Sequence, residues 1–301
     1  MSKDFGLFTD IVLHSIGSDI GAGRSVANNI IMSSPTLSRW SLENKYILIT
    51  GGSRGIGNGV VHAALKHKPA GIIICSYSVT QLNKAISAIN DPRVKGVDCD
   101  ISIEDGRTKL VTFVNEHFSQ LDVLVNNVGV NIRQPVTEQT SEEYHRIMAT
   151  NVDSTYFLCK SFLPLLKKSG GASIVNVASA AGVQSSGTGA AYGMSKAAVI
   201  HYTKILACEW AQYKIRVNAI APWMCMTPML QDALKGDEKQ LDKVYDWTPM
   251  GRIGEIQEIV DPIMFLMMGC SSFVTGQCLG VDGGLTAQGF QGPCVAMSGE
   301  N

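Results

Sequence analysis

Short apolar, β-branched runs alternate with longer segments of helical periodicity from Lys45 almost to the end of the chain. Apolar strands joined by helical crossovers are typical of a parallel sheet covered by helices on both faces. We therefore predict an α/β fold with a doubly wound parallel sheet of seven strands and six crossovers. The expected strands are 46–50, 71–76, 94–99, 121–126, 172–178, 215–221 and 277–281, and the expected helices are about 56–68, 79–90, 103–118, 141–168, 190–213 and 255–268.

The length and composition of the chain favour one domain. Of its 301 residues 45% are apolar, which is enough for a single large core. We expect this domain to span 39–290, with an N-terminal extension at 1–38 that could be a flexible arm and a C-terminal tail at 291–301. The longest irregular stretch, 222–254, is expected to form a substrate loop. Ligands of such sheets bind at the carboxyl ends of the strands.

The charge and the cysteines argue against several kinds of partner. Lys plus Arg number 25 against 26 acidic residues, so the formal charge of -1 gives no general attraction to nucleic acid or to an anionic membrane. No uninterrupted apolar run is long enough to span a membrane. The eight cysteines lack metal-ligand spacing and are predicted to be buried thiols, with no metal site, in a reducing, cytoplasmic compartment. An organelle address within 1–38 stays open.

A glycine-rich turn directly follows the first expected strand and precedes a segment of helical character. Glycines at these spacings allow a tight turn and a close approach of the backbone, so amide groups and the helix N-terminus can hold a pyrophosphate. The turn thus predicts a dinucleotide site in a Rossmann-like fold, and an ordinary glycine turn is the alternative. The segment reads Thr50-Gly51-Gly52-Ser53-Arg54-Gly55-Ile56-Gly57.

The end of the second expected strand bears on which dinucleotide binds. A carboxylate there suits a free ribose hydroxyl, whereas a cation nearby suits a 2′-phosphate. The strand ends in Cys75-Ser76-Tyr77 without a carboxylate, and Arg54 lies in the phosphate loop. We therefore expect NADP(H) rather than NAD(H), with Arg54 and Ser76 near the phosphate. The alternative for Arg54 is a solvated loop cation.

Tyr192 and Lys196 stand four residues apart at the start of an expected helix and share one helical face. A neighbouring ammonium favours the phenolate, so we expect Lys196 to lower the pKa of Tyr192 from its usual value of about 10. The other donors of Lys196 can bind ribose hydroxyls. Ser179 follows the fifth expected strand and can hold the substrate oxygen. The three residues predict hydride transfer between a nicotinamide and a carbonyl or alcohol.

These motifs, in this order, resemble those of the short-chain dehydrogenase/reductase family over about residues 39–290. Within that family the sequence is most similar to tropinone-reductase-like enzymes, which implies reduction of a small ketone with NADPH and does not imply an alkaloid. The resemblance also implies a homodimer or homotetramer that pairs through the helices at 141–168 and 190–213, although these could simply cover the sheet. The motifs are Thr-Gly-x-x-x-Gly-x-Gly from Thr50, Arg39-Trp40-Ser41-Leu42, Asn126-Asn127-Val128-Gly129-Val130-Asn131-Ile132-Arg133, Tyr192-Gly193-Met194-Ser195-Lys196 and Val281-Asp282-Gly283-Gly284-Leu285.

The resemblance implies further site residues. Asp100 would contact adenine, with a plain helix N-cap as the alternative. Asn126 would brace the central sheet and Gly129 would let the backbone pass under the cofactor, with a generic polar turn as the alternative. Asn151 would interrupt a long helix and hold a water on a proton path, and Thr227 would bind the carboxamide. The expected catalytic residues are Asn151, Ser179, Tyr192 and Lys196, and the expected cofactor-binding residues are Gly51, Ser53, Arg54, Gly55, Ile56, Gly57, Ser76, Asp100, Asn126, Gly129, Tyr192, Lys196 and Thr227.

One departure from the family pattern is Trp223, which follows Pro222 where a glycine is usual. We hypothesise that its large ring narrows or roofs the carbonyl pocket. The segment that follows carries apolar side chains that suit a hydrophobic substrate and an adaptable lid, or simple packing against the body. They are Met224, Met226, Met229, Leu230, Leu234, Tyr245, Trp247 and Met250.

Two other functions stay open. A 3-oxoacyl-carrier-protein reductase uses the same chemistry and would need a basic surface for its acidic carrier, which the near-neutral charge supports only weakly. A non-catalytic dinucleotide-binding sensor could keep Gly51, Gly55 and Gly57 while losing Tyr192 or Lys196. Both of those residues are present, which favours an enzyme.

Overall fold

The computed structural model describes residues 39–234, 236 and 238–288. The predicted extension at 1–38 and the predicted tail at 291–301 lie outside the described residues, together with 289 and 290 at the end of the predicted domain. The fold given below is that of the described part.

Seven parallel strands form one sheet in the order β3-β2-β1-β4-β5-β6-β7, which confirms the predicted doubly wound, Rossmann-like fold. β1 pairs with β2 on one side and with β4 on the other, so the strand order reverses between β1 and β4. Ligands of open parallel sheets bind at the carboxyl ends beside such a reversal. The strands are β1 (Tyr46–Thr50), β2 (Gly71–Ser76), β3 (Val94–Asp98), β4 (Val123–Asn126), β5 (Ala172–Val177), β6 (Ile215–Pro222) and β7 (Cys278–Val281).

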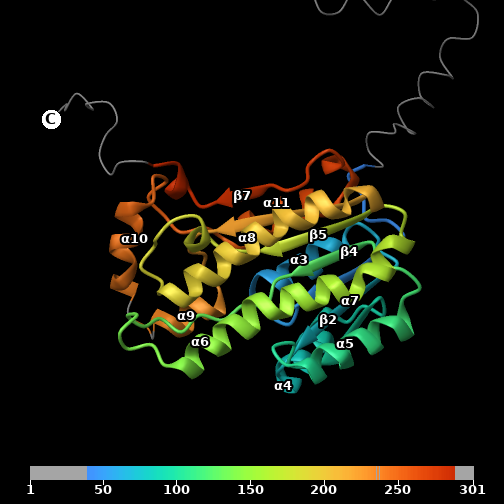
Figure 1. The fold of residues 1–301 in the computed structure, drawn as a ribbon, viewed down its shortest axis with the longest axis horizontal. Coiled ribbons are helices and arrows are strands. Elements are labelled where there is room, and N and C mark those ends of the chain that lie inside the picture. The colour runs from blue at the N-terminus through green and yellow to red at the C-terminus, as the bar shows by residue number, and fades with distance from the viewer. Residues whose placement is uncertain (1–38, 235, 237, 289–301) are drawn as a thin grey trace, which may run out of the picture. The chain divides into compact units, whose positions relative to one another are not determined.

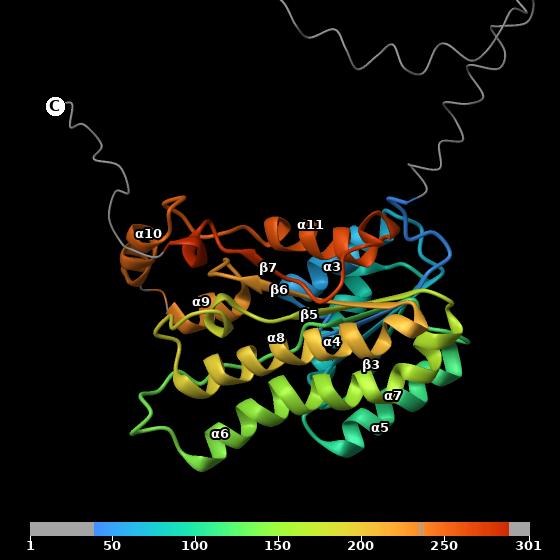
Figure 2. The same ribbon diagram turned by 45° about the horizontal axis from the view of Figure 1, so that its top comes forward.

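Helices cover both faces of this sheet (Figures 1 and 2). One face carries α3 (Gly55–Leu65), α4 (Val79–Ile89) and α11 (Ile256–Met267), and the other carries α5 (Glu104–His117), α7 (Ser154–Lys168) and α8 (Ala190–Trp210). Successive side chains of β1 enter the two cores in turn. Ile47 and Ile49 pack in the first core and Leu48 in the second, because neighbouring strand residues point to opposite faces.

The helix expected at 141–168 is divided into three pieces. α6 (Ser141–Met148) begins with a capping box between Thr140 and Glu143, a π-helical segment follows at Ala149–Asp153, and α7 continues from Ser154. Such π-helical insertions are often found at functional sites. The insertion contains Asn151, so the interruption that the resemblance implied at this residue is present.

The stretch at 222–254 is more regular than expected. Pro222 belongs to β6, and the loop contains α9 (Pro228–Leu234) and α10 (Asp242–Trp247), which lie at one end of the sheet in Figure 1. Both helices are short, so their packing on the body stabilises them more than their propensity does. The remaining 3₁₀ segments are Ala180–Gly182, Ala211–Tyr213, Glu238–Leu241, Gly269–Ser271 and Leu285–Ala287.

The prediction that the cysteines are buried thiols holds for four of the seven described. Cys208 is exposed and two others are half-buried, which corrects the prediction for these positions, and Cys294 lies outside the described residues. None of these seven forms a disulfide with another of them. The buried ones are Cys75, Cys99, Cys159 and Cys225, and the half-buried ones are Cys270 and Cys278.

Candidate active site

The phosphate loop between β1 and α3 adopts a conformation that requires glycine. Gly51 and Gly55 have φ of +66° and +56°, in the left-handed region that side chains with a Cβ rarely adopt. A Cβ on Gly57 would overlap the carbonyl oxygen of Gly51. The backbone at Gly57 therefore lies against the backbone at Gly51. Ile56 packs against the core that contains α3.

The N-terminus of α3 is open to an anion. Its N-cap, Arg54, makes no side-chain capping bond, and the first turn holds no acidic residue. The first amides of a helix lack intrahelical partners and carry partial positive charge, so they favour a bound phosphate. The loop thus fits the pyrophosphate of a dinucleotide.

Asn127 holds this loop in place, a role that the sequence analysis did not assign to it. Its Nδ2 donates to the carbonyl oxygen of Thr50 at 2.9 Å, and its backbone N–H donates to the Thr50 hydroxyl at 2.9 Å. The phosphate loop after β1 is thereby tied to the end of β4. The sequence feature that could have indicated this role is the second asparagine, Asn127, directly after the fourth expected strand.

Ser53 meets Ser76 at the end of β2, whereas the side chain of the neighbouring Arg54 reaches α9. The Ser53 hydroxyl donates to Ser76 Oγ at 3.2 Å, and the Arg54 guanidinium lies 3.6 Å from the carboxylate of Asp232 on α9. Tyr77 is 70% exposed beside them. Arg54 is therefore not a purely solvated cation, because its side chain also forms an ion pair with Asp232 in the loop at 222–254.

Asp100 follows β3 and shapes the turn before α5. Its Oδ1 accepts from the backbone N–H and the hydroxyl of Ser102, at 2.9 and 2.6 Å. The helix begins later, with Ile103 as its N-cap, so the alternative that Asp100 is the helix N-cap is wrong. Contact with adenine stays a prediction.

Asn126 is buried in β4, so the alternative of a generic polar turn is wrong for this residue. Its Nδ2 donates to Asn176 Oδ1 on β5 at 2.9 Å and to Cys159 Sγ on α7 at 3.3 Å. Close by, Gly129 leaves room for Lys196: a Cβ on Gly129 would lie 3.0 Å from Lys196 Nζ.

Ser179, Tyr192 and Lys196 meet at the carboxyl edge of the sheet. Ser179 follows β5, where its Oγ accepts from the Ala181 N–H at 3.2 Å, and its side chain lies near enough to the Tyr192 phenol to lower the pKa of that phenol. Lys196 lies one turn beyond Tyr192 on α8, with Nζ 5.8 Å from the centre of the phenol ring. Lys196 Nζ donates to the carbonyl oxygen of Val177 at 2.8 Å, which fixes the ammonium at the end of β5.

The pKa of Tyr192 shifts in the opposite direction to the one expected from the sequence. Burial raises the pKa of Tyr192, and the Ser179 hydrogen bond and the charge of Arg133 offset only part of that rise. Burial lowers the pKa of Lys196 to about 8. The expected lowering of the Tyr192 pKa by Lys196 is therefore wrong, because burial dominates and the opposing cation is Arg133.

Asn151 holds the loop that follows β4. Its Oδ1 accepts from the Val130 N–H at 2.8 Å, and its Nδ2 donates to the Val130 carbonyl oxygen at 3.0 Å and to Ser195 Oγ at 2.9 Å. The Ser195 hydroxyl in turn donates to the carbonyl oxygen of Tyr192 at 2.7 Å. Asn151 thus connects the loop after β4 to the first turn of α8, and its role in holding a water stays a prediction.

Thr227 directly precedes α9 and lies next to the phosphate loop. Its Oγ1 accepts from the Leu230 N–H at 3.3 Å, and its Cβ would lie 3.9 Å from a Cβ on Gly55. The loop at 222–254 therefore reaches the phosphate loop at Gly55, and contact of Thr227 with the carboxamide stays a prediction.

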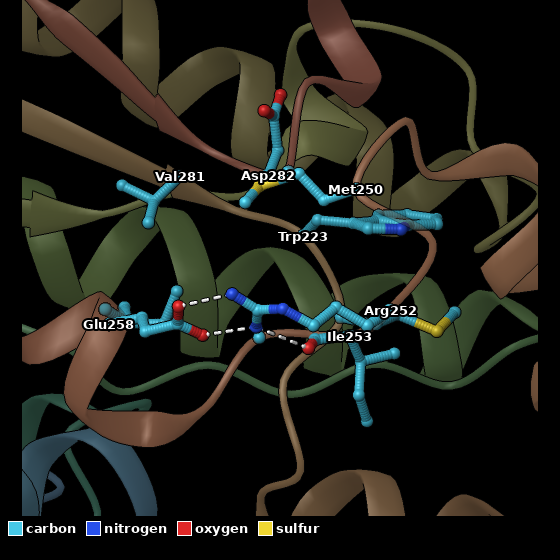
Figure 3. A pocket seen from close by; sticks show the side chains of 11 residues that line it. Trp223, Met250, Arg252, Ile253, Glu258, Val281 and Asp282 are labelled. Carbon is cyan, nitrogen blue, oxygen red and sulfur yellow. Dashed lines mark hydrogen bonds and ion pairs between the residues drawn. The ribbon is translucent and has the colours of Figure 1, made fainter.

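Trp223 anchors the loop at 222–254. Its Nε1–H donates to Thr248 Oγ1 at 3.1 Å, and its backbone N–H donates to the carbonyl oxygen of Val281. Figure 3 shows the ring with Met250 at a cavity of ≈ 110 Å³, across from the paired side chains of Arg252 and Glu258. These contacts support an anchoring role, and narrowing of the carbonyl pocket stays a prediction.

Two findings bear on other classes of function. Among the described residues, no group of three or more His, Cys, Asp and Glu side chains could hold a metal ion. Within the same part of the chain, no helix is both long and apolar enough to cross a membrane.

Comparison with known proteins identifies the family. The sequence model of a family described as enoyl-(acyl carrier protein) reductase matches residues 51–286. A tropinone reductase homologue of Arabidopsis thaliana is 42% identical over 258 residues, which cover 85% of this chain and 97% of that protein. A chloroplastic tropinone reductase homologue of the same plant is 40% identical over 255 residues, covering 84% of this chain and 79% of its own. The crystal structure of a gluconate 5-dehydrogenase from Burkholderia cenocepacia in complex with NADP and tartrate is 28% identical, with a TM-score of 0.78, covering 84% of this chain and 99% of that chain.

A sheet and a sequence of this kind define an oxidoreductase that acts on CH–OH and C=O groups with a nicotinamide dinucleotide. The chain belongs to the short-chain dehydrogenase/reductase family, and the relatives just described include tropinone reductase homologues. The resemblance inferred from the motifs is thereby confirmed.

Proposed function

We propose that this chain is an NADP(H)-dependent reductase of small ketones, with the corresponding secondary alcohols as substrates of the reverse reaction. The observation that carries the proposal is the meeting of Ser179, Tyr192 and Lys196 at the same sheet edge as an uncapped phosphate loop. One catalytic domain at 39–290 would hold both substrates.

The residues present fit the dinucleotide. The loop from Gly51 to Gly57 and the first turn of α3 would hold the pyrophosphate, and Lys196 Nζ keeps two donors beyond its bond to Val177 for ribose hydroxyls. Thr227 would contact the carboxamide, and Asp100 the adenine. When bound, the nicotinamide supplies the hydride for the carbonyl carbon or accepts it from the alcohol.

Each catalytic residue has one task in this proposal. The Ser179 hydroxyl donates to the substrate oxygen and stabilises the charge that develops there. The Tyr192 hydroxyl gives that oxygen its proton in reduction and takes it back in oxidation. Lys196 supplies positive charge next to the phenol, and Asn151 positions α8 through Ser195. The raised pKa of Tyr192 keeps the phenol protonated at neutral pH, which favours reduction.

The preference for NADP(H) rests on the end of β2. Ser76 and Ser53 offer hydroxyls there, Arg54 offers a cation, and β2 ends without a carboxylate. A 2′-phosphate gains charge-assisted hydrogen bonds from such a group. The NADP complex of the Burkholderia cenocepacia relative is consistent with this preference.

The proposal is tested by following nicotinamide absorbance with NADPH or NADH and a broad panel of ketones. Tyr192→Phe should lower kcat by about 10²–10⁴-fold, because the proton donor is lost, while NADPH binding is kept. Tyr202→Phe, which changes another tyrosine of α8, should leave kcat nearly unchanged and serves as the control. Binding of NADPH without turnover of any ketone would instead indicate a dinucleotide sensor.

We also propose a homodimer or homotetramer that pairs through α7 and α8. These helices expose Tyr156, Phe157 and Ile205, large apolar side chains that water solvates poorly. Light scattering on the purified chain should give a mass of two or four chains, and a stable monomer would contradict the proposal. For location we propose the cytoplasm, which suits the free thiols of the described residues; microscopy of a carboxyl-terminal fluorescent fusion tests this.

A further inference from the structure

A second pocket, of ≈ 580 Å³, lies beside the catalytic residues. Its wall includes Gly193, which follows Tyr192 in α8, and Ala181, whose backbone N–H donates to Ser179. The other walls are the loop after β4, at 133–136, and the loop before α8, at 185–190. A substrate whose carbonyl lies at Ser179 and Tyr192 could extend into this space.

Arg133 is the one charged side chain among the residues that line this pocket. Within the described part of the chain its guanidinium takes part in none of the ion pairs. Its charge nevertheless acts on the Tyr192 phenol. An unpaired cation next to a reaction centre is a typical element of anion recognition, because guanidinium groups bind carboxylates in a bidentate manner.

The other residues that line the pocket are uncharged, and several can donate hydrogen bonds to an anion. Ser185, Ser186 and Thr188 contribute hydroxyls, and no carboxylate faces the pocket from its lining residues. The pocket also meets the first turn of α8, whose N-cap is Gly189 and which holds no acidic residue. The partial positive charge at this helix start adds to that of Arg133. Gly189 lies against the backbone of Gln134, so the two loops support each other.

We infer that this pocket binds a carboxylate of the substrate through Arg133, so that the preferred substrates are keto acids and the corresponding hydroxy acids. The inference rests on the proposed function and narrows its substrate class. A ketone that carries a protonated amine would be repelled by Arg133 and should be a poor substrate.

The test compares matched ketones that differ in charge. Short keto acids, from acetoacetate to levulinate and its next homologue, are assayed with NADPH beside their methyl esters and a keto amine of similar length. Wild type should prefer at least one acid over its ester by about tenfold or more in kcat/KM, as expected for a charged hydrogen bond. Added salt should reduce this preference.

Variants of the cation then separate recognition from structure. Arg133→Gln should remove the preference for the acid over its ester, and it should raise kcat/KM for the keto amine relative to that ester. Arg133→Lys should keep part of the preference, because it keeps the charge and loses the planar fork. Arg146→Gln, an exposed arginine of α6 outside the pocket, is the matched control and should behave as wild type.

The outcomes distinguish the inference from the proposed function. If esters are reduced as well as acids, or if Arg133→Gln lowers both equally, the inference is overturned and the proposed function stands. If no ketone of any charge is reduced, the proposed function fails, and calorimetry with the keto acids decides on the anion site alone. Binding that is lost in Arg133→Gln supports the site, whereas no binding or equal binding overturns it.

Discussion

The ammonium of Lys196 lies 5.8 Å from the centre of the Tyr192 ring and donates to the carbonyl oxygen of Val177 at 2.8 Å. One cation is thus held between the end of β5 and the first turn of α8. Its burial lowers its pKa to about 8. The position that serves the proposed chemistry is therefore one at which a charge destabilises the fold.

Replacing this lysine should stabilise the protein and abolish its activity. Because the pKa of Lys196 falls from 10.5 to about 8 on folding, the unfolded chain binds more protons between these values, and stability rises with pH across that window. Below it the full cost of the buried charge is present, about 3 kcal/mol. Lys196→Met removes this cost and about 1 kcal/mol of hydrogen bonding, so a net gain of about 2 kcal/mol is expected.

Urea unfolding of wild type and Lys196→Met, at neutral pH and near pH 10, measures this effect. The advantage of the variant should shrink as pH rises. Lys204→Met, at an exposed position of α8, should show no such dependence. An advantage of equal size at both pH values would contradict the assignment of the cost to a buried ammonium.

The raised pKa of Tyr192 predicts opposite pH dependences for the two directions. Reduction needs the protonated phenol and should stay level through neutral pH, then fall as the phenol ionises. Oxidation needs the phenolate and should increase as pH rises. Initial rates in both directions between about pH 6 and 11 test this, and an oxidation rate that is independent of pH would argue against Tyr192 as the proton carrier.

Arg54→Gln should weaken the binding of NADPH and leave the binding of NADH nearly unchanged. The loss of a charge-assisted bond to the 2′-phosphate is expected to raise the Kd for NADPH by about tenfold or more. Asp232→Asn is the matched control, because it removes the ion pair with Arg54 but keeps the cation. Titration of nicotinamide fluorescence measures both cofactors, and equal weakening of NADPH and NADH would indicate a merely structural role.

Trp223→Gly should raise the rate on bulky ketones relative to small ones, if the ring narrows the carbonyl pocket. Thr248→Val removes the hydrogen-bond partner of the indole and keeps the ring, so it should leave the relative rates unchanged. The measurement is kcat/KM over ketones of increasing size. Unchanged relative rates in Trp223→Gly would reject the narrowing hypothesis and leave loop anchoring as its role.

Regular local patterns allowed most of the fold to be predicted. The apolar runs at 46–50 and 71–76 coincide with β1 and β2, because strands buried on both faces leave a continuous signal in the sequence. The sequence did not predict that the interruption at Asn151 is π-helical, or that the loop at 222–254 contains α9 and α10. Their conformation depends on partners far along the chain, such as Val130 for Asn151.

The sequence by itself determined which residues could share a site, since helical geometry places Tyr192 and Lys196 on one face and strand ends gather at one edge. Only the tertiary structure decided the sign of the Tyr192 pKa shift and brought Arg133 to the pocket beside it. The physical reason is that burial and charge act through space, and the distances they depend on are set by packing between segments far apart in the chain.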